Sequence, residues 1–410
     1  MNYYNFFKAN YGILLFGGIL VFFSNFGQAF LLSLYIPSIL ESFEITRSEY
    51  SLLYSSATLL SAFTIIFAGK MIDRFDLKKF AFLVILGFAT ACMVAALSIN
   101  IVMLFFAVFL LRFFGQGMLS HTAMTTMGRY FHLARGKALS ISYLGFPIGE
   151  AILPLTIISV IAIAGWRETF MITAALVVLV LMPIAMIIIS RFKPDDIIEQ
   201  PSKDTTAKNE KINSKEGISN EKTFSQRDVL KSKYFIYFAP TVMLIGFTLT
   251  ALFFFQTFIA DFKGWPLELM AGGITGYASA SIVFSIIAGP LIDKFTARKI
   301  FPFVLLPLAS GIVVLSLFTH PIAPVFFWTL AGITAGIQSP VINALYAEVF
   351  GVKTLGSVRS LFTFVMVFST ALGPIVYSLL LDVGLSYNSI HYIIAGIIVL
   401  ASASVFYFRK

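Results

Sequence analysis

Long apolar runs separated by short polar breaks are the main pattern of this chain. Twelve of them come close to or exceed the roughly 20 residues that an α-helix needs to cross the hydrocarbon core of a bilayer. Their apolar residues are continuous rather than alternating with polar ones, which argues against membrane β-strands. We therefore predict twelve transmembrane helices, over residues 11–36, 49–70, 79–98, 101–127, 138–164, 168–190, 234–260, 267–291, 300–318, 322–347, 355–381 and 388–408.

A charged segment divides these runs into two sets of six. Residues 191–233 contain 18 of the chain's 49 charged residues and few aromatic ones, so this segment lacks the apolar surface that folding requires. We predict an all-α membrane protein with an N-terminal six-helix half at 1–190, a cytoplasmic linker at 191–233 and a C-terminal six-helix half at 234–410.

A short charged segment between the second and third runs recurs in the second half. Residues 69–79 and 289–299 carry the same pattern of glycine, aspartate and basic residues at an offset of 220 positions. Internal duplication of a membrane unit is typical of secondary transporters. We therefore expect two pseudo-symmetric halves. Further pairs at the same offset are Gly136 with Gly356, Ser140 with Ser360 and Pro154 with Pro374.

The composition and charge fit a membrane protein. Hydrophobic residues make up 58% of the chain and charged residues 12%, against about 25% charged residues in soluble proteins. With the N-terminus placed inside, the predicted cytoplasmic segments and the adjoining cytoplasmic ends of the spans hold 25 of the 29 lysines and arginines, as the positive-inside rule requires. We predict a multi-pass protein of the cell membrane (the inner membrane in a bacterium) with both termini cytoplasmic. The net charge of +9 then needs no nucleic-acid partner.

Enzyme chemistry has no support in the sequence. The one cysteine, Cys92, lies within an apolar run, so a disulfide framework or a cysteine-based metal site is not expected. No segment resembles a phosphate-binding loop, a zinc-binding histidine pair or a nucleophile elbow. We predict a protein that is not an enzyme, uses no cofactor and does not hydrolyse ATP.

The segment at 69–79 resembles the signature G-x-L-x-D-R-x-G-R-R/K of the major facilitator superfamily, which lies between spans two and three. Asp76 takes the place of the second glycine, and Asp also tolerates turn conformations. Residues 112–117 are similar to the family's Arg-and-Gly signature of span four, and 145–149 to its Gly-Pro element of span five. The resemblance covers essentially the full chain. The signature positions that match are Gly69, Asp73, Arg74 and Lys78.

The resemblance implies a conformational role for the duplicated segment. Asp73 would latch the two halves together in the outward-open state, with Arg129 as a candidate partner and Asp293 as the counterpart in the second half. The alternative is a short solvated turn whose positive charges only set the topology. The predicted latch comprises Gly69, Asp73, Arg74, Lys78, Arg129, Asp293 and Arg298.

Two charged residues fall in the middle of predicted spans. At 1.5 Å per residue, Arg112 lies about 24 Å and Glu150 about 20 Å from the cytoplasmic ends of spans four and five. A salt bridge or a shared hydrogen-bond network would reduce the cost of burying them. The carboxylate could then couple proton movement to transport, or the arginine could bind a substrate anion. The alternative is a static pair that fixes helix packing.

Uncharged polar residues extend this candidate site. Gln116 follows Arg112 by one helical turn, and Tyr143 precedes Glu150 by two turns on the same face. Polar residues on other spans are candidates for lining a central cavity, or alternatively for hydrogen bonds between helices. These are Asn25 and Gln28 on span one, Gln256 on span seven, Tyr277 on span eight, and Gln338 and Asn343 on span ten.

Together these features predict a monomeric secondary transporter that moves a small organic solute by alternating access, with protons as the coupling ion. A multidrug or amphiphile exporter is the nearest alternative, because aromatic content and the Gly-Pro element suit apolar cations. A carboxylate transporter or exchanger is weakened because Arg112 is the one lysine or arginine near the middle of a predicted span. A membrane-embedded enzyme or a solute sensor has neither a catalytic cluster nor a signalling domain to support it.

Overall fold

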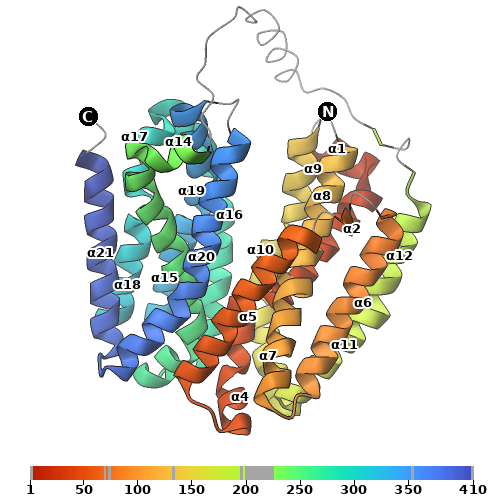
Figure 1. Ribbon diagram of the computed structural model, residues 1–410, viewed down its shortest axis with the longest axis horizontal. Coiled ribbons are helices and arrows are strands. Elements are labelled where there is room, and N and C mark those ends of the chain that lie inside the picture. Colours follow the sequence, from red (N-terminus) through yellow and green to blue (C-terminus); the bar gives the residue numbers. More distant parts are fainter. Residues whose placement is uncertain are drawn as a thin grey trace, which may run out of the picture. The chain divides into compact units, whose positions relative to one another are not determined.

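The computed structural model consists of helices and their short connections over the residues it describes, which are 3–68, 71–72, 75–131, 134–193, 197–198, 226–351 and 355–407 (Figure 1). No strand occurs in these ranges. Ten helices within them are long and apolar enough to cross a membrane, or eleven if one bent pair counts as a span. Helix α5, Arg47–Ala68, lies on the remaining predicted span. The predicted all-α membrane fold is confirmed.

The first half of the chain forms helices whose ends agree with the predicted runs to within a few residues, except in the first span. Short side chains start two of them, since Asp76 accepts from the Lys79 amide at 3.2 Å and Asn100 from the Met103 amide at 2.9 Å. The elements are α1 Tyr3–Ala9, α2 Tyr11–Ser24, η1 Asn25–Gly27, α3 Ala29–Leu32, η2 Ser33–Tyr35, α4 Ile36–Phe43, α5 Arg47–Ala68, α6 Leu77–Ala96, α7 Ile101–Leu110, η4 Leu111–Leu119, α8 Ser120–Tyr130, α9 Arg135–Tyr143, α10 Gly145–Ala164, α11 Trp166–Leu176, η5 Val177–Leu181 and α12 Met182–Arg191.

Most spans of the second half are single long helices, and the ninth span is divided into α17, η7 and α18. Ser232 starts the longest of these helices by accepting from the Phe235 amide at 3.2 Å, and Gly264 ends it with a positive φ of 66°. The elements are α14 Gln226–Lys231, α15 Lys233–Lys263, α16 Leu267–Phe295, α17 Ala297–Ile300, η7 Phe301–Phe303, α18 Leu306–Leu317, α19 Ala323–Phe350, α20 Leu355–Asp382 and α21 Tyr387–Tyr407.

The first span is broken, whereas the sequence predicts one continuous helix over 11–36. Gln28 has extended backbone angles (φ −83°, ψ 152°), and the segments 11–27 and 29–43 meet at a bend of 45°. The break frees backbone groups that a continuous helix would pair. Hydropathy cannot reveal it, because both sides of the break are equally apolar.

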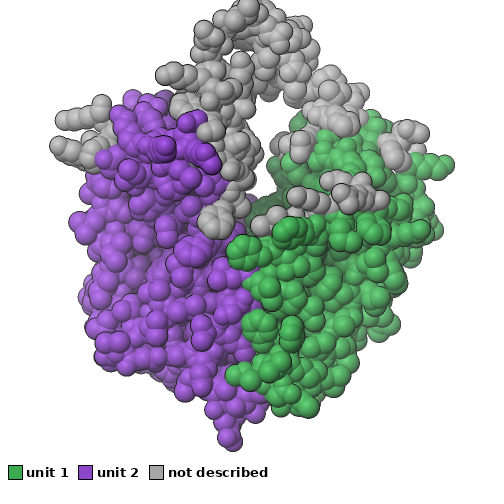
Figure 2. All heavy atoms as spheres, in the orientation of Figure 1, with its two compact units in different colours: residues 1–31, 60–149, 159–220 green, residues 32–59, 150–158, 221–410 purple. Residues whose placement is uncertain are grey.

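The described residues form two compact units (Figure 2). The first contains 1–31, 60–149 and 159–220, and the second contains 32–59, 150–158 and 221–410. The second unit therefore includes two segments from the predicted N-terminal half. The division into halves at 1–190 and 234–410 stays a prediction.

Glycines allow close approaches between helices within each unit. In the first unit, a Cβ on Gly17 of α2 would lie 2.6 Å from the Ser142 hydroxyl of α9. In the second, a Cβ on Gly332 of α19 would overlap the backbone of Tyr277 on α16, and Gly336 is equally close to Ser281. Small residues spaced by four let membrane helices approach at backbone distance, which explains how tightly α16 and α19 pack.

Candidate transport site and its supporting contacts

Arg112 binds the break in the first span. Its guanidinium Nη1 donates to the Gly27 carbonyl oxygen at 2.9 Å, and the side chain is 3% exposed. A charged donor on a buried carbonyl makes a strong hydrogen bond. A Cβ on Gly27 would overlap the Gln116 amide nitrogen, so the two spans touch through their backbones here. Arg112 therefore stabilises the broken helix, a role that depends on a break the sequence does not reveal.

Asn25 connects the first span to the fifth. This fully buried residue donates through Nδ2 to the carbonyls of Phe22 at 3.0 Å and Phe146 at 3.2 Å. A Cβ on Gly149 would overlap the Asn25 amide, so the glycine makes room for this contact. The Asn25 Oδ1 atom is buried without a hydrogen-bond partner among the described residues, which leaves an acceptor beside the break.

The structure brings Asn25, Gln28, Arg112 and Gln116 together around the break in the first unit. The Gln28 amide donates to the Asn25 carbonyl at 2.9 Å, and the side chains of Gln28 and Gln116 are half-buried. Tyr143 is 52% exposed and stacks on Phe146 with ring centroids 5.6 Å apart.

Glu150 is 4% exposed within α10. Its own carbonyl lacks the usual helical donor, because the residue four positions later is Pro154. The next carbonyl, of Ala151, accepts from the Thr275 hydroxyl of α16 at 2.9 Å. Glu150 belongs to the second unit and Arg112 to the first, and their pairing stays a prediction.

The other predicted cavity residues lie in the second unit. Gln256 is fully buried and donates to the Ser33 hydroxyl at 2.7 Å, which agrees with the alternative of a hydrogen bond between helices. Tyr277 lies 5.3 Å from the Phe253 ring and 6.0 Å from the Trp328 ring. On α19, Gln338 is half-buried and Asn343 donates to the Ser339 carbonyl at 2.8 Å.

The predicted latch lies only in part within the described residues. Gly69, Asp73, Arg74 and the Asp293 side chain fall outside them. Arg129 donates to the Ile72 carbonyl at 3.1 Å, so it holds the backbone beside Asp73. Lys78 is exposed.

In the second copy of the segment, Glu348 caps the start of α17, a role that the sequence did not predict. Glu348 accepts from the Ala297 amide at 2.8 Å and from the Arg298 amide at 3.1 Å. A carboxylate at a helix N-terminus is favoured by the helix dipole. The Arg298 guanidinium lies 5.6 Å from the centre of the Tyr234 ring.

Polar contacts at the start of α5 are a second group that the sequence reasoning missed. Arg47 Nη1 donates to the Tyr387 hydroxyl at 3.2 Å, and its guanidinium lies 4.6 Å from the centre of the Phe258 ring. Ser48 contacts the Ser378 hydroxyl at 2.9 Å and donates to the Asp382 carboxylate. These side chains join α5 to α15, α20 and α21 within the second unit. No local sequence signal identifies them, because the partners lie more than 200 positions apart.

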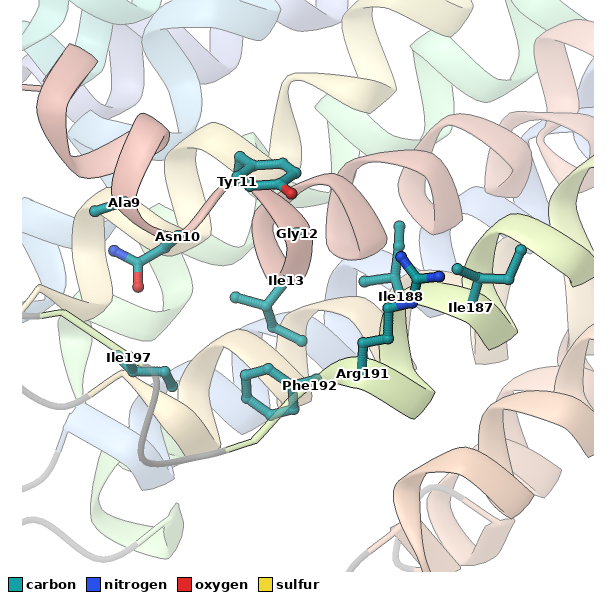
Figure 3. A pocket seen from close by; sticks show the side chains of 10 residues that line it. All are labelled: Ala9, Asn10, Tyr11, Gly12, Ile13, Ile187, Ile188, Arg191, Phe192 and Ile197. Atoms are coloured by element: carbon teal, nitrogen blue, oxygen red, sulfur yellow. The ribbon is translucent and has the colours of Figure 1, made fainter.

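A cavity in the first unit lies apart from these residues. It has a volume of about 410 Å³ and lies where α1 and α2 meet the end of α12 (Figure 3). Most of its wall is apolar, and Asn10 and Arg191 contribute polar groups. None of the predicted transport residues lines it.

These features define a polytopic membrane protein with buried polar groups at a helix break. The sequence matches the description Major Facilitator Superfamily over residues 15–279 and 242–410. The chain therefore belongs to the major facilitator superfamily and is a transporter rather than an enzyme.

Similar proteins agree with this assignment. A protein of Cupriavidus necator (strain ATCC 17699 / DSM 428 / KCTC 22496 / NCIMB 10442 / H16 / Stanier 337), named Probable sulfoacetate transporter SauU, is 29% identical over 145 residues. That match covers 35% of this chain and about a third (34%) of the relative's length.

Two solved structures share the fold. The nucleoside transporter NupG aligns with a TM-score of 0.73 at 14% identity, covering 97% of this chain and 99% of its own. A bacterial homologue of the human lysosomal transporter Spinster, in an inward-facing and unoccupied conformation, aligns with a TM-score of 0.72 at 15% identity, covering 98% and 97%.

Proposed function

We propose that this transporter moves a small organic solute across the cell membrane by alternating access and couples that movement to protons. The observation that carries the proposal is Glu150, a carboxylate that is 4% exposed inside a membrane-spanning helix. An ionisable residue at such a position is expensive to maintain and marks ion or substrate pathways. Glu150 is the proposed proton carrier.

The alternating-access part of the proposal is supported by the duplicated segments at 69–79 and 289–299. In our proposal the halves 1–190 and 234–410 move about a site near the midplane, and Asp73 latches them in one state. In the proposed topology both termini lie in the cytoplasm. The proposed transporter is a monomer. In a bacterium the membrane would be the inner one.

A small organic anion is the substrate class that we favour. The similarity to a probable sulfoacetate transporter supports it, and so does the buried cation of Arg112. The Asn25 Oδ1 atom and the half-buried Gln116 and Gln28 would supply polar contacts beside it. A multidrug exporter would need a broad apolar pocket for cations, which these residues do not favour.

The test uses purified protein in proteoliposomes, with uptake of a panel of small carboxylates and sulfonates measured under an imposed pH gradient. We expect at least one to accumulate with the gradient. Glu150→Gln should abolish this accumulation, because the amide cannot carry a proton. It should leave exchange of labelled for unlabelled substrate intact. Glu268→Gln is the matched control, since Glu268 is an exposed carboxylate at the start of α16.

Two outcomes contradict separate parts of the proposal. If the Glu150→Gln protein accumulates substrate like the unaltered protein, Glu150 is not the proton carrier. Absence of flux for every anion, together with proton-driven export of a lipophilic cation, would instead support the multidrug alternative.

A further inference from the structure

A buried histidine in the last helix is held by hydrogen bonds on both ring nitrogens. His391 Nδ1 lies 3.0 Å from the Ser316 hydroxyl of α18, and Nε2 lies 2.8 Å from the Tyr377 hydroxyl of α20. His391 and Tyr377 are fully buried and Ser316 is 4% exposed. His391 lies about 6 Å along α21 from the first residue of that helix, Tyr387.

The geometry defines which atom donates at each contact. The Ser316 hydroxyl already donates to the Ile312 carbonyl at 3.0 Å, so it accepts from His391 Nδ1–H. Nε2 is then the acceptor of the neutral ring, and Tyr377 donates to it. The chain of donors therefore holds His391 as the neutral tautomer protonated on Nδ1.

A second proton on Nε2 would disturb this arrangement. The Tyr377 hydroxyl would have to turn from donor to acceptor. The new positive charge would also lie near Lys263, whose ammonium donates to the Ser316 carbonyl at 2.8 Å. Like charges in a buried site repel strongly because the surroundings screen them little.

The histidine group is continuous with the contacts of α5. Tyr377 is followed by Ser378, which contacts Ser48. The ring centre of Tyr377 lies 6.2 Å from that of Tyr387, whose hydroxyl accepts from Arg47. The charged or titratable groups around His391 are Lys263 and Asp261 of α15, Tyr377 and Asp382 of α20, Tyr387 of α21 and Arg47 of α5.

We propose that His391 is a proton-binding site whose occupancy controls whether α5 stays packed against α20 and α21. The neutral ring fits the packed arrangement. Protonation favours separation of α5, which admits water to the imidazolium and increases its distance from Arg47. Only the effect of His391 on transport depends on the proposed function. The proposal itself can be tested without a substrate and without Glu150.

The test is disulfide formation between cysteines placed at Ser48 and Ser378, whose hydroxyls are 2.9 Å apart. The background is Cys92→Ser, since Cys92 is the one native cysteine. The protein is reconstituted in nanodiscs, which expose both faces to one pH. A second protein carries the same cysteine pair together with His391→Gln, and its thiol chemistry is the same. The cross-linking rate with His391 present, divided by the rate with His391→Gln, therefore reports the effect of the histidine.

We expect this ratio to fall about fivefold between pH 7.5 and about pH 4, with most of the fall below the range in which an unperturbed histidine titrates, because burial and the nearby Lys263 ammonium oppose the second proton on His391. His320→Gln is the matched control, because His320 is exposed in the loop before α19, and it should retain the full pH dependence. A ratio that stays constant with pH would overturn the proposal.

A second variant guards against a His391→Gln protein that does not fold. Tyr377→Phe keeps the ring stacked on Phe255, 4.6 Å between centroids, and removes only the donor to Nε2. Protonation no longer competes with that donor, so the fall in cross-linking should move to higher pH. An unchanged midpoint in a folded Tyr377→Phe protein would also contradict the role of His391.

Discussion

Arg112 donates a hydrogen bond to the backbone of another span. A charged residue inside a predicted span can therefore have a backbone carbonyl as its partner. The expectation from spacing is a partner carboxylate or a substrate anion. One contact of the Arg112 guanidinium is with the Gly27 carbonyl at the helix break. This contact gives Arg112 a structural role, and because a guanidinium has five N–H donors, the same side chain can also bind a substrate anion.

Arg112→Gln tests that structural role. Loss of the charged donor leaves the Gly27 carbonyl poorly satisfied, so we expect a loss of about 1–3 kcal/mol in the free energy of unfolding. Thermal unfolding in detergent measures the change. Gln116→Ala alters a half-buried neighbour one turn away and should cost less. Equal losses for the two variants would show that the Gly27 contact is not special.

Thr296 is strained in a way that the internal repeat explains. It has φ 69° and ψ 149°, a region that favours glycine. Its counterpart one repeat earlier is Asp76, which has φ −56° and caps α6. Both occupy the place of the second glycine in the family signature.

Thr296→Gly should therefore stabilise the protein by about 1 kcal/mol, because it removes the strain of a β-branched residue at positive φ. Asp76→Gly is the control and should give no gain, since it removes a helix cap from an unstrained position. Unfolding in detergent again provides the measurement. A destabilised Thr296→Gly protein would argue against backbone strain at this position.

At the scale of elements, hydropathy locates the helices well and their irregularities poorly. The predicted span 79–98 is α6, Leu77–Ala96, and the predicted span 267–291 lies within α16. The break at Gln28 and the π-helical segment η4 are not visible, because both depend on backbone hydrogen bonds within apolar sequence. The criterion that selects Arg112, an ionisable residue inside a predicted span, also applies to His391, so the sequence alone could have identified His391 as a candidate.

The α16–α19 contact gives a prediction at this scale. Gly332→Ala would push a methyl group into the Tyr277 backbone, so α16 and α19 must separate. We expect a loss of at least about 2 kcal/mol in the free energy of unfolding. Gly396→Ala is the matched control, because among the described residues no side chain and no atom of another helix lies within 4 Å of its Cβ position. The yield of monodisperse protein and its unfolding temperature distinguish the two.

For the whole molecule, sidedness is the prediction that underlies the others. In a Cys92→Ser background, a cysteine at Val383, which is 82% exposed, should react with an impermeant maleimide added to intact cells. A cysteine at Lys294, an exposed residue in the last turn of α16, should react only after permeabilisation. The reverse pattern would invert the proposed topology.

The Arg47–Tyr387 contact has a consequence for biosynthesis. The two residues are 340 positions apart, and synthesis at about 5–20 residues per second separates their emergence by about 17–70 s. During that interval α5 is in the membrane without α20 and α21, and its polar residues Arg47 and Ser48 lack their hydrogen-bond partners Tyr387, Ser378 and Asp382. The second compact unit can therefore be completed only when the last helix has been inserted, and a ribosome that stalls in the final span leaves it open.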